Sequence, residues 1–307
     1  MRDPRFPRIL DLILMALIYL GGSILGAIPL LIIVFAQAAE GGGALDPETL
    51  ANPLGNIDPA WISHLAPLMA GLPLILVAIY GWRKLGKPEW DLGFKGLPLG
   101  AVLLAIFGTL LIANGTVMVA EYLPGYDAFV DAMEQMLLPG IGMAIAIIIG
   151  APVLEEAVFR GLILRGYLRK TEPWKAILLS GFLFGLLHIL PIHVFFASIV
   201  GFALGYVYYR TRSLGLVILI HFINNGLSYL ASQFDTPDTT SELTGWGPAG
   251  VLLLAFALTA AGVGLLYLLG QRYPLVAPPS GELNAPAEAP APTASVGWGP
   301  PPADKTS

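Results

Sequence analysis

The chain contains no cysteine and few charged residues, and each shortage excludes a class of protein. Without cysteine there can be no disulfide framework, thiolate metal site or cysteine nucleophile. Only 12% of the 307 residues are charged, whereas a soluble chain usually has about a quarter. Hydrophobic residues make up 56%, the mean hydropathy is +0.74, and no basic stripe with interleaved aromatics indicates nucleic-acid binding. The composition therefore predicts an integral membrane protein.

Apolar runs long enough to cross roughly 30 Å of hydrocarbon occur eight times along the chain. We therefore predict an all-α fold, a polytopic membrane helix bundle with about eight transmembrane helices. The fifth and sixth runs are short and close together, so seven spans are the main alternative. The expected spans are Ile9–Ala38, Trp61–Trp82, Leu97–Tyr122, Pro139–Leu164, Trp174–Leu190, His193–Tyr209, Leu214–Ser232 and Pro248–Gly270.

The basic residues predict the orientation of the bundle. With eight spans, every Lys and Arg except Arg160 falls on the side of the N-terminus, and the opposite loops hold acidic residues and no basic ones. By the positive-inside rule, both termini are cytoplasmic, and we expect a bacterial plasma membrane. An uncleaved first helix is favoured over a signal peptide, because its apolar part exceeds the usual length of about 7 to 15 residues and contains Asp11.

Three charged residues lie close together within the fourth predicted span. They are Glu155, Glu156 and Arg160. A charge at the centre of a membrane helix costs roughly 2.5 to 3.5 kcal/mol on insertion scales, so such residues pair with one another or serve a function. Glu156 and Arg160 stand at i and i+4, about 40° apart on a helix, which predicts an ion pair. Glu155 points elsewhere without a local partner, so it is the candidate reactive carboxylate.

Polar residues on two further spans predict contacts across the bundle. His188 lies on the fifth span, and His221 and Asn225 share one face of the seventh. A membrane histidine is more often a buried hydrogen bond than a catalyst, intramembrane Asn commonly joins helices, and the ion pair could be purely structural. Together, however, these three helices supply the groups that catalysis needs. They carry a base, a proton carrier and hydrogen-bond donors, in the form of an unpaired Glu, two His and an Asn. Gly201 and Gly205 predict close helix packing.

Three short motifs on separate spans resemble those of the CPBP (CAAX protease and bacteriocin-processing, or Abi) intramembrane proteases, which include the Rce1-type prenyl endopeptidase. The resemblance covers about Gly140 to Leu230, and the motifs are specific together although each alone is weak. In chain order they are Glu155-Glu156-x-x-x-Arg160, Phe184-x-x-x-His188 and His221-x-x-x-Asn225.

The resemblance implies an eight-helix fold with a central polar cavity open toward the cytoplasm, and endopeptidase activity on a membrane-associated protein or peptide. A non-enzymatic membrane protein of the same fold, such as a proton-coupled carrier, scaffold or immunity-type binder, is the alternative. The resemblance also implies residue roles: water is activated by Glu155 and His188, the oxyanion is stabilised by His221 and Asn225, and the site is organised by Glu156 with Arg160.

The sequence leaves metal dependence open. Zinc is the candidate cofactor, because a catalytic zinc site needs about three N or O ligands and an open position for water. Four side chains could supply these ligands: Glu155, Glu156, His188 and His221. The alternative, which we favour, is that Glu and His act without metal. The expected partners are the substrate and the lipid bilayer, and nothing in the sequence indicates whether the substrate is prenylated.

We expect four parts along the chain. Residues 1–138 form N-terminal transmembrane helices and outer loops, 139–232 the catalytic core, 233–273 the last transmembrane helix, and 274–307 a disordered tail rich in Pro and Ala. Within the first part, Tyr126–Leu138 has apolar residues at helical spacing and is either an interfacial amphipathic helix or an ordered loop.

Overall fold

The structure is a computed structural model that describes residues 3, 5–40, 58–90, 92–94, 96–137, 139–234 and 239–276. Within these residues every regular element is a helix, which confirms the predicted all-α fold. The first outer loop (41–57) and the predicted tail from residue 277 onward lie outside the described residues.

Seven helices are long and apolar enough to cross a membrane, which confirms a polytopic bundle in the described part of the chain. One of the seven is a composite helix over Ile141–Tyr167. The others are continuous α-helices: α1 (Ile9–Glu40), α3 (Pro59–Lys84), α4 (Leu99–Ala120), α10 (Pro191–Thr211), α11 (Leu214–Ala231) and α13 (Pro248–Arg272).

The fifth expected span, Trp174–Leu190, corresponds to the shorter apolar helix α9 (Pro173–Leu186). Its 14 residues extend about 21 Å, less than the roughly 30 Å of a membrane core. The chain then turns at Ile189, which has a φ of 64°, and α10 begins at Pro191. The hairpin of the fifth and sixth expected spans therefore contains one helix that is too short to cross by itself.

The composite helix alternates between α and π geometry. Its central element, α7 (Ala151–Val158), carries both glutamates and lies between two π segments, η1 (Ile145–Gly150) and η2 (Phe159–Leu164). Short α-helical turns complete its ends, α6 (Ile141–Ala144) and α8 (Arg165–Tyr167). A π turn is rare and occurs frequently at functional sites. The backbone of this span is therefore irregular on both sides of the predicted site.

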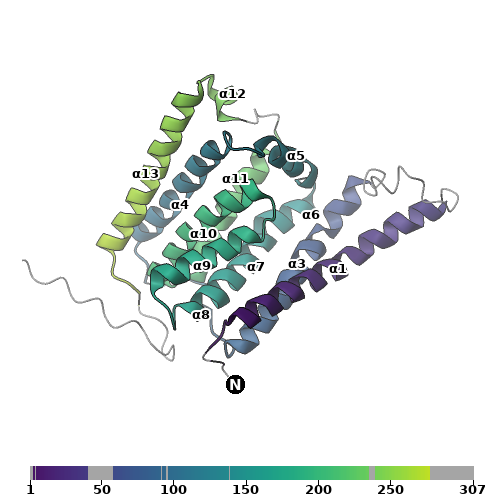
Figure 1. Cartoon of the computed structure of the whole chain (residues 1–307), viewed down its shortest axis with the longest axis horizontal. Coiled ribbons are helices and arrows are strands. Elements are labelled where there is room, and N and C mark those ends of the chain that lie inside the picture. The colour runs from purple at the N-terminus through teal and green to yellow at the C-terminus, as the bar shows by residue number, and fades with distance from the viewer. Residues whose placement is uncertain are drawn as a thin grey trace, which may run out of the picture.

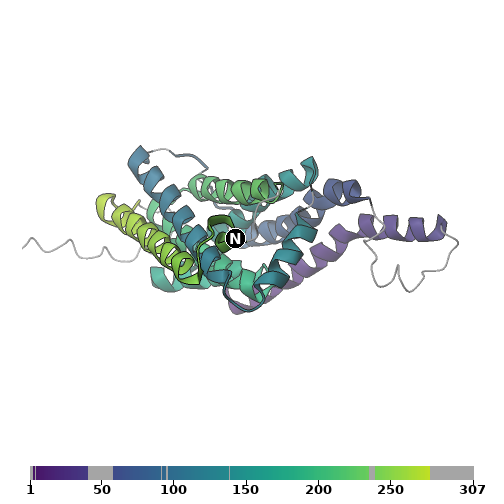
Figure 2. The same ribbon diagram turned by 90° about the horizontal axis from the view of Figure 1, so that it is seen from above.

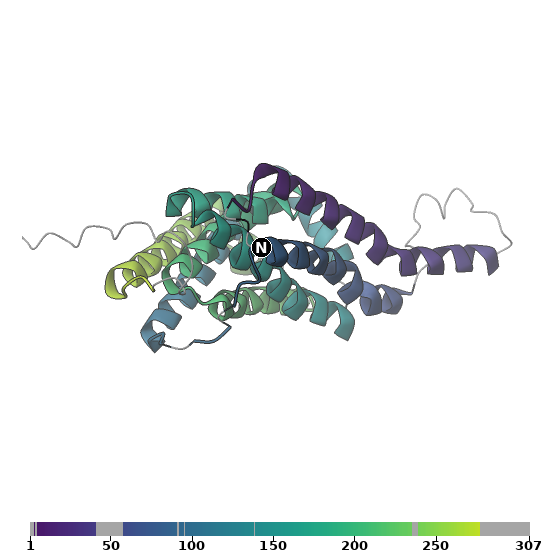
Figure 3. The same ribbon diagram turned by 90° about the horizontal axis from the view of Figure 1, so that it is seen from below.

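The helices form three groups across the bundle (Figure 1). Helices α4 and α13 pack against each other at one edge, and α1 and α3 pack against each other at the opposite edge. The composite helix lies between them with α9, α10 and α11, and views from above and below show the same order (Figures 2 and 3). The charged fourth span is therefore an inner helix that contacts α3, α9 and α11.

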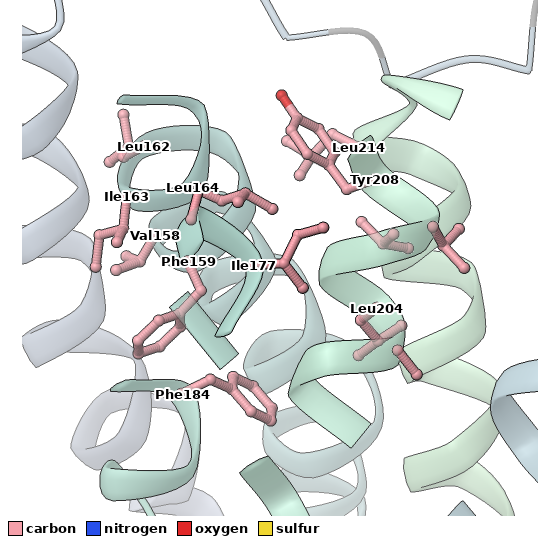
Figure 4. Close-up of a cluster of buried hydrophobic side chains, with 14 of the residues drawn as sticks. Val158, Phe159, Leu162, Ile163, Leu164, Ile177, Phe184, Leu204, Tyr208 and Leu214 are labelled. Atoms are coloured by element: carbon pink, nitrogen blue, oxygen red, sulfur yellow. The ribbon is translucent and has the colours of Figure 1, made fainter. Parts of the chain in front are cut away.

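The largest apolar cluster joins the composite helix to α9, α10 and α11 (Figure 4). Leu162 and Leu164 of η2 and Leu204 of α10 are each 0% exposed. Phe159 of η2 meets Phe184 of α9 edge to face, with ring centroids 5.4 Å apart. Such contacts hold helices together in lipid, where no hydrophobic driving force acts between them. The cluster therefore fixes η2 and α9 next to the glutamates.

Helices α9 and α10 approach very closely where two glycines meet. A Cβ added at Gly201 would lie 2.8 Å from the Gly181 carbonyl oxygen, and one added at Gly181 would lie 2.8 Å from the Gly201 carbonyl carbon. No other residue type fits this crossing without moving the backbones. The close packing predicted for Gly201 is confirmed, and its partner is Gly181 on α9.

The segment after α4 forms helix α5 (Tyr126–Met136), as the amphipathic alternative predicts. Tyr126 is buried, and the Phe129 ring packs edge to face on Phe196 of α10 at 5.2 Å. Asp127 and Asp131 are exposed on the other side of the helix. The helix therefore covers the end of α10 with its apolar side.

Basic residues from separate loops meet at one end of the bundle. Lys170 Nζ donates to the Arg5 carbonyl at 2.8 Å, and Arg165 Nη1 donates to the Glu89 carbonyl at 2.6 Å. These bonds join the N-terminal segment, the α3–α4 loop and the segment at α8 at a single end. That this end faces the cytoplasm stays a prediction. Three basic residues lie outside the described part: Arg2, Lys95 and Lys305.

Candidate active site

Glu156 and Arg160 form a completely buried ion pair, which confirms the prediction from their spacing. Arg160 Nη1 donates to Glu156 Oε1 at 2.8 Å, and both side chains are 0% exposed. Arg160 Nη2 also donates to the Gly201 carbonyl at 2.9 Å, and the guanidinium lies 4.6 Å from the centroid of the Phe184 ring. The Arg160 guanidinium therefore contacts a carboxylate, a carbonyl and an aromatic face, whereas its Nε and Glu156 Oε2 have no hydrogen-bond partner among the described residues.

His221 hydrogen-bonds to the same carboxylate from the neighbouring helix α11. Its Nδ1 lies 2.9 Å from Glu156 Oε1. Because an ionised carboxylate can only accept, we assign the proton to Nδ1, which leaves Nε2 free for another contact. Glu156 Oε1 thus accepts from both Arg160 and His221. Glu156 fixes the orientation of the imidazole ring.

Glu155 faces the other nitrogen of the same ring. Its Oε2 lies 3.8 Å from His221 Nε2, and the residue is 9% exposed. A separation of 3.8 Å is too long for a direct hydrogen bond, and a water molecule between the two atoms can bond to both. The expectation that Glu155 has no partner on its own helix and faces another helix is confirmed.

Asn225 lies one turn beyond His221 on α11 and is half-buried. Its Nδ2 donates to the backbone carbonyl of Ile147 in η1 at 3.1 Å. The two polar residues on this face of α11 therefore contact different parts of the composite helix, His221 a side chain of α7 and Asn225 the backbone of η1.

His188 follows the end of α9 instead of lying within a helix. Its Nδ1 lies 3.1 Å from the Phe184 carbonyl, so His188 bonds to its own helix, whereas the sequence predicts only contacts across the bundle. A side chain just past the last turn can reach the free carbonyls of its helix. The Phe184 ring contacts both site histidines, with centroids 5.2 Å from His188 and 5.6 Å from His221. His193 is a further neighbour, and the centroid of its ring lies 4.2 Å from that of the His188 ring.

The structure brings the predicted residues together to different degrees. Both glutamates, Arg160 and His221 form one polar cluster, whereas His188 and Asn225 lie beside it and reach it through the Phe184 ring and the η1 backbone. Among the described residues, no group of three or more His, Cys, Asp or Glu side chains is placed to hold a metal ion. Glu156 and His221 already bond to each other, so the four-residue zinc site is not assembled in this arrangement.

Sequence reasoning gives no role in the cluster to three groups that shape it, although Phe184 belongs to the second motif and Gly201 is predicted to pack closely. The Gly201 carbonyl binds Arg160, the Phe184 ring contacts Arg160 and both histidines, and Ser180 Oγ donates to the Phe159 carbonyl of η2 at 2.9 Å. Gly201 has a sequence signal, since a glycine that permits close packing also exposes its carbonyl. Ser180 has none, because a serine in an apolar helix commonly bonds to its own backbone.

One hollow in the described part of the chain lies away from this cluster. Its volume is about 480 Å³, and its lining includes Pro98, Arg210 and Tyr273 at the basic end of the bundle. The central polar cavity that the resemblance implies stays a prediction.

Comparison with known proteins matches the part of the chain that holds the cluster. Residues 137–227 match the family model described as "Type II CAAX prenyl endopeptidase Rce1-like". The protein named "Putative membrane peptidase YdiL" from Bacillus subtilis (strain 168) is 30% identical over 99 residues, 32% of this chain and 39% of that protein. The match thus spans less than half of that curated relative, and no solved structure matches the chain. Residues 137–227 are therefore similar to the Rce1-like CAAX proteases of the CPBP family.

Proposed function

We propose that the chain is an intramembrane endopeptidase that hydrolyses a peptide bond of a membrane-associated protein or peptide. One observation carries the proposal: the buried carboxylate of Glu155 faces an oriented imidazole nitrogen across 3.8 Å. The second carboxylate is neutralised by Arg160 and holds that imidazole. A general base and a proton carrier on opposite sides of one water site are what peptide hydrolysis needs. The family of residues 137–227 supports this class of reaction.

In the proposed reaction, Glu155 acts as the general base. A water between Glu155 Oε2 and His221 Nε2 gives its proton to the carboxylate as its oxygen attacks the scissile carbonyl carbon. The protonated Glu155 then transfers that proton to the leaving amine, and the C–N bond breaks. His188 is the second residue proposed to bind this water, since its Nδ1 bond to Phe184 leaves Nε2 free.

The oxyanion formed in this step needs hydrogen-bond donors. His221 can donate from Nε2 only after the neutral ring takes a second proton from solvent, and the Glu156 carboxylate, which accepts from Nδ1, is the counter-charge of that imidazolium. We therefore propose His221 as the oxyanion donor and Glu156 with Arg160 as the residues that organise it. Asn225 is the second donor that the family resemblance implies.

We propose a glutamate-type mechanism without metal. Two of the four zinc candidates, Glu156 and His221, hydrogen-bond each other. A zinc ion would have to displace this bond and leave the guanidinium of Arg160 as the neighbour of a cation. The side chains as arranged supply a base and a donor directly.

The test compares newly formed protein termini in membranes from cells that produce the wild type or Glu155→Gln. Glutamine keeps the shape of the side chain and cannot take a proton, so we expect a loss of cleavage of about 10²- to 10⁴-fold at unchanged protein level. Glu172→Gln is the matched control, because Glu172 is an exposed carboxylate paired with Lys175. Termini that persist in the Glu155→Gln membranes would refute the proposal, and proton flux lost in this variant would instead favour a carrier.

A further inference from the structure

The backbone of η1 leaves one carbonyl without a regular partner. The Ala151 N–H donates to the Ala146 carbonyl, five residues back, in the π register. In the same i to i−5 pattern, the next bond would run from the N–H of residue 152 to the Ile147 carbonyl. Residue 152 is proline, which has no N–H. Because a backbone carbonyl away from water needs a donor, the Ile147 carbonyl must find one elsewhere.

Asn225 supplies that donor from another helix. Its Nδ2 lies 3.1 Å from the Ile147 carbonyl oxygen, and α11 packs along η1. The second π segment has a similar tie, since Ser180 of α9 donates to the Phe159 carbonyl at 2.9 Å. Each π segment beside the glutamates is thus bonded to a side chain from a neighbouring helix.

The π register determines where Glu155 points. A single π turn adds one residue to a helix, which rotates all later side chains by about 100° relative to an uninterrupted α-helix. Glu155 comes two turns after Ile147 on the same composite helix. A return of η1 to the α register would therefore move the carboxylate off the face that meets His221.

We infer that Asn225 is a positioning residue, which holds η1 in the π register by replacing the N–H that Pro152 lacks. The inference rests on the proposed function, because it explains how Glu155 is aimed at His221. It assigns to Asn225 a role through the backbone of Ile147, in contrast to direct donation to the oxyanion. Asn225→Ala then damages the site by releasing η1, and a new backbone N–H at position 152 compensates.

The experiment is a double-mutant cycle with Asn225→Ala and Pro152→Ala. Alanine at position 152 restores an N–H to the register, where it can donate to the Ile147 carbonyl. Amide hydrogen exchange of a peptide covering residues 141–158 is measured by mass spectrometry on detergent-purified protein. We expect Asn225→Ala to speed exchange at least tenfold, and the double variant to return within about threefold of the wild type. This readout does not depend on proteolysis, so it tests the inference even if the proposed function fails.

Cleavage is measured in parallel as the abundance of new protein termini at matched levels of each variant. We expect Asn225→Ala to lower the turnover by tenfold or more and the added Pro152→Ala to restore it. Asn114→Ala on α4 is the matched control, since this exposed asparagine has the same carboxamide, donates to the Leu110 carbonyl of its own helix and should leave both readouts unchanged. Two results would overturn the inference and leave Asn225 as an oxyanion donor. One is that Asn225→Ala lowers turnover equally with Pro152 and with Ala at position 152, and the other is that Asn225→Ala alone leaves amide exchange unchanged.

Discussion

At the scale of the residue, Glu156 determines the geometry of the cluster. One of its oxygens accepts from Arg160 at 2.8 Å and from His221 at 2.9 Å, so a single carboxylate fixes both a guanidinium and an imidazole. The i, i+4 spacing on one helix predicts the first bond. Nothing in one sequence predicts the second, because it depends on how α11 rotates against α7. Glu155 was identifiable from the same helix geometry, since it lacks a partner there.

Removal of the buried guanidinium should destabilise the protein strongly. Arg160→Met leaves Glu156 without its ion-pair partner and the Gly201 carbonyl without a donor, and breaking such a pair costs about 3 to 5 kcal/mol. Thermal unfolding of the detergent-purified variant should therefore begin at a clearly lower temperature. Lys175→Met, at an exposed pair, should leave the transition unchanged. Equal transitions for Arg160→Met and wild type would show that the pair contributes nothing to the fold.

The Phe184 ring should matter through its aromaticity. Phe184→Leu keeps an apolar side chain and loses the face that meets Arg160 at 4.6 Å and the contacts with both histidines. A desolvated cation–π contact contributes about 2 kcal/mol, so we expect that loss of stability together with slower cleavage. Phe184→Tyr, which keeps the ring, is the comparison. A leucine variant as active as the tyrosine variant would contradict this role.

At the scale of the element, the sequence predicts long helices well and their interruptions poorly. The apolar run Trp174–Leu190 continues past the end of α9, and Ile189, which turns the chain, is not a turn-forming residue, so the short helix is hidden. The π segments are hidden for a different reason. Apolar periodicity does not show one extra residue in a fully apolar helix, and Pro152 is the single sequence signal near η1.

The glycine crossing of α9 and α10 should be intolerant of a methyl group. Gly201→Ala places a Cβ 2.8 Å from the Gly181 carbonyl and pushes the Gly201 carbonyl away from Arg160. We expect a cost of about 1 to 3 kcal/mol in unfolding measurements, together with reduced cleavage. Gly264→Ala on α13 is the control, because among the described residues no atom lies within 4 Å of its added Cβ. If both variants behave alike, close approach at Gly201 does not support the site.

At the scale of the whole molecule, charge asymmetry organises the bundle. The distribution of Lys and Arg predicts that the basic loops share one side, and the structure joins several of them by hydrogen bonds at one end. The fold class and the location of the glutamates also follow from the sequence. How the three helix groups pack does not, because small side-chain differences among apolar helices decide it.

The absence of cysteine allows a direct test of orientation. Asp131→Cys on α5 and Lys175→Cys at the start of α9 both replace exposed residues. With the basic end in the cytoplasm, a membrane-impermeant maleimide should label Asp131→Cys in intact cells and Lys175→Cys only after permeabilisation. If Lys175→Cys is labelled in intact cells and Asp131→Cys only after permeabilisation, the orientation is the opposite one and the basic loops lie outside the cell.

The most direct measurement is an experimental structure of the Glu155→Gln variant with a bound substrate peptide. The proposed mechanism places the scissile carbonyl carbon about 3 to 3.5 Å from a water held between residue 155 and His221 Nε2. A peptide bound instead in the hollow beside Arg210 and Tyr273, with no density near residue 155, would contradict it.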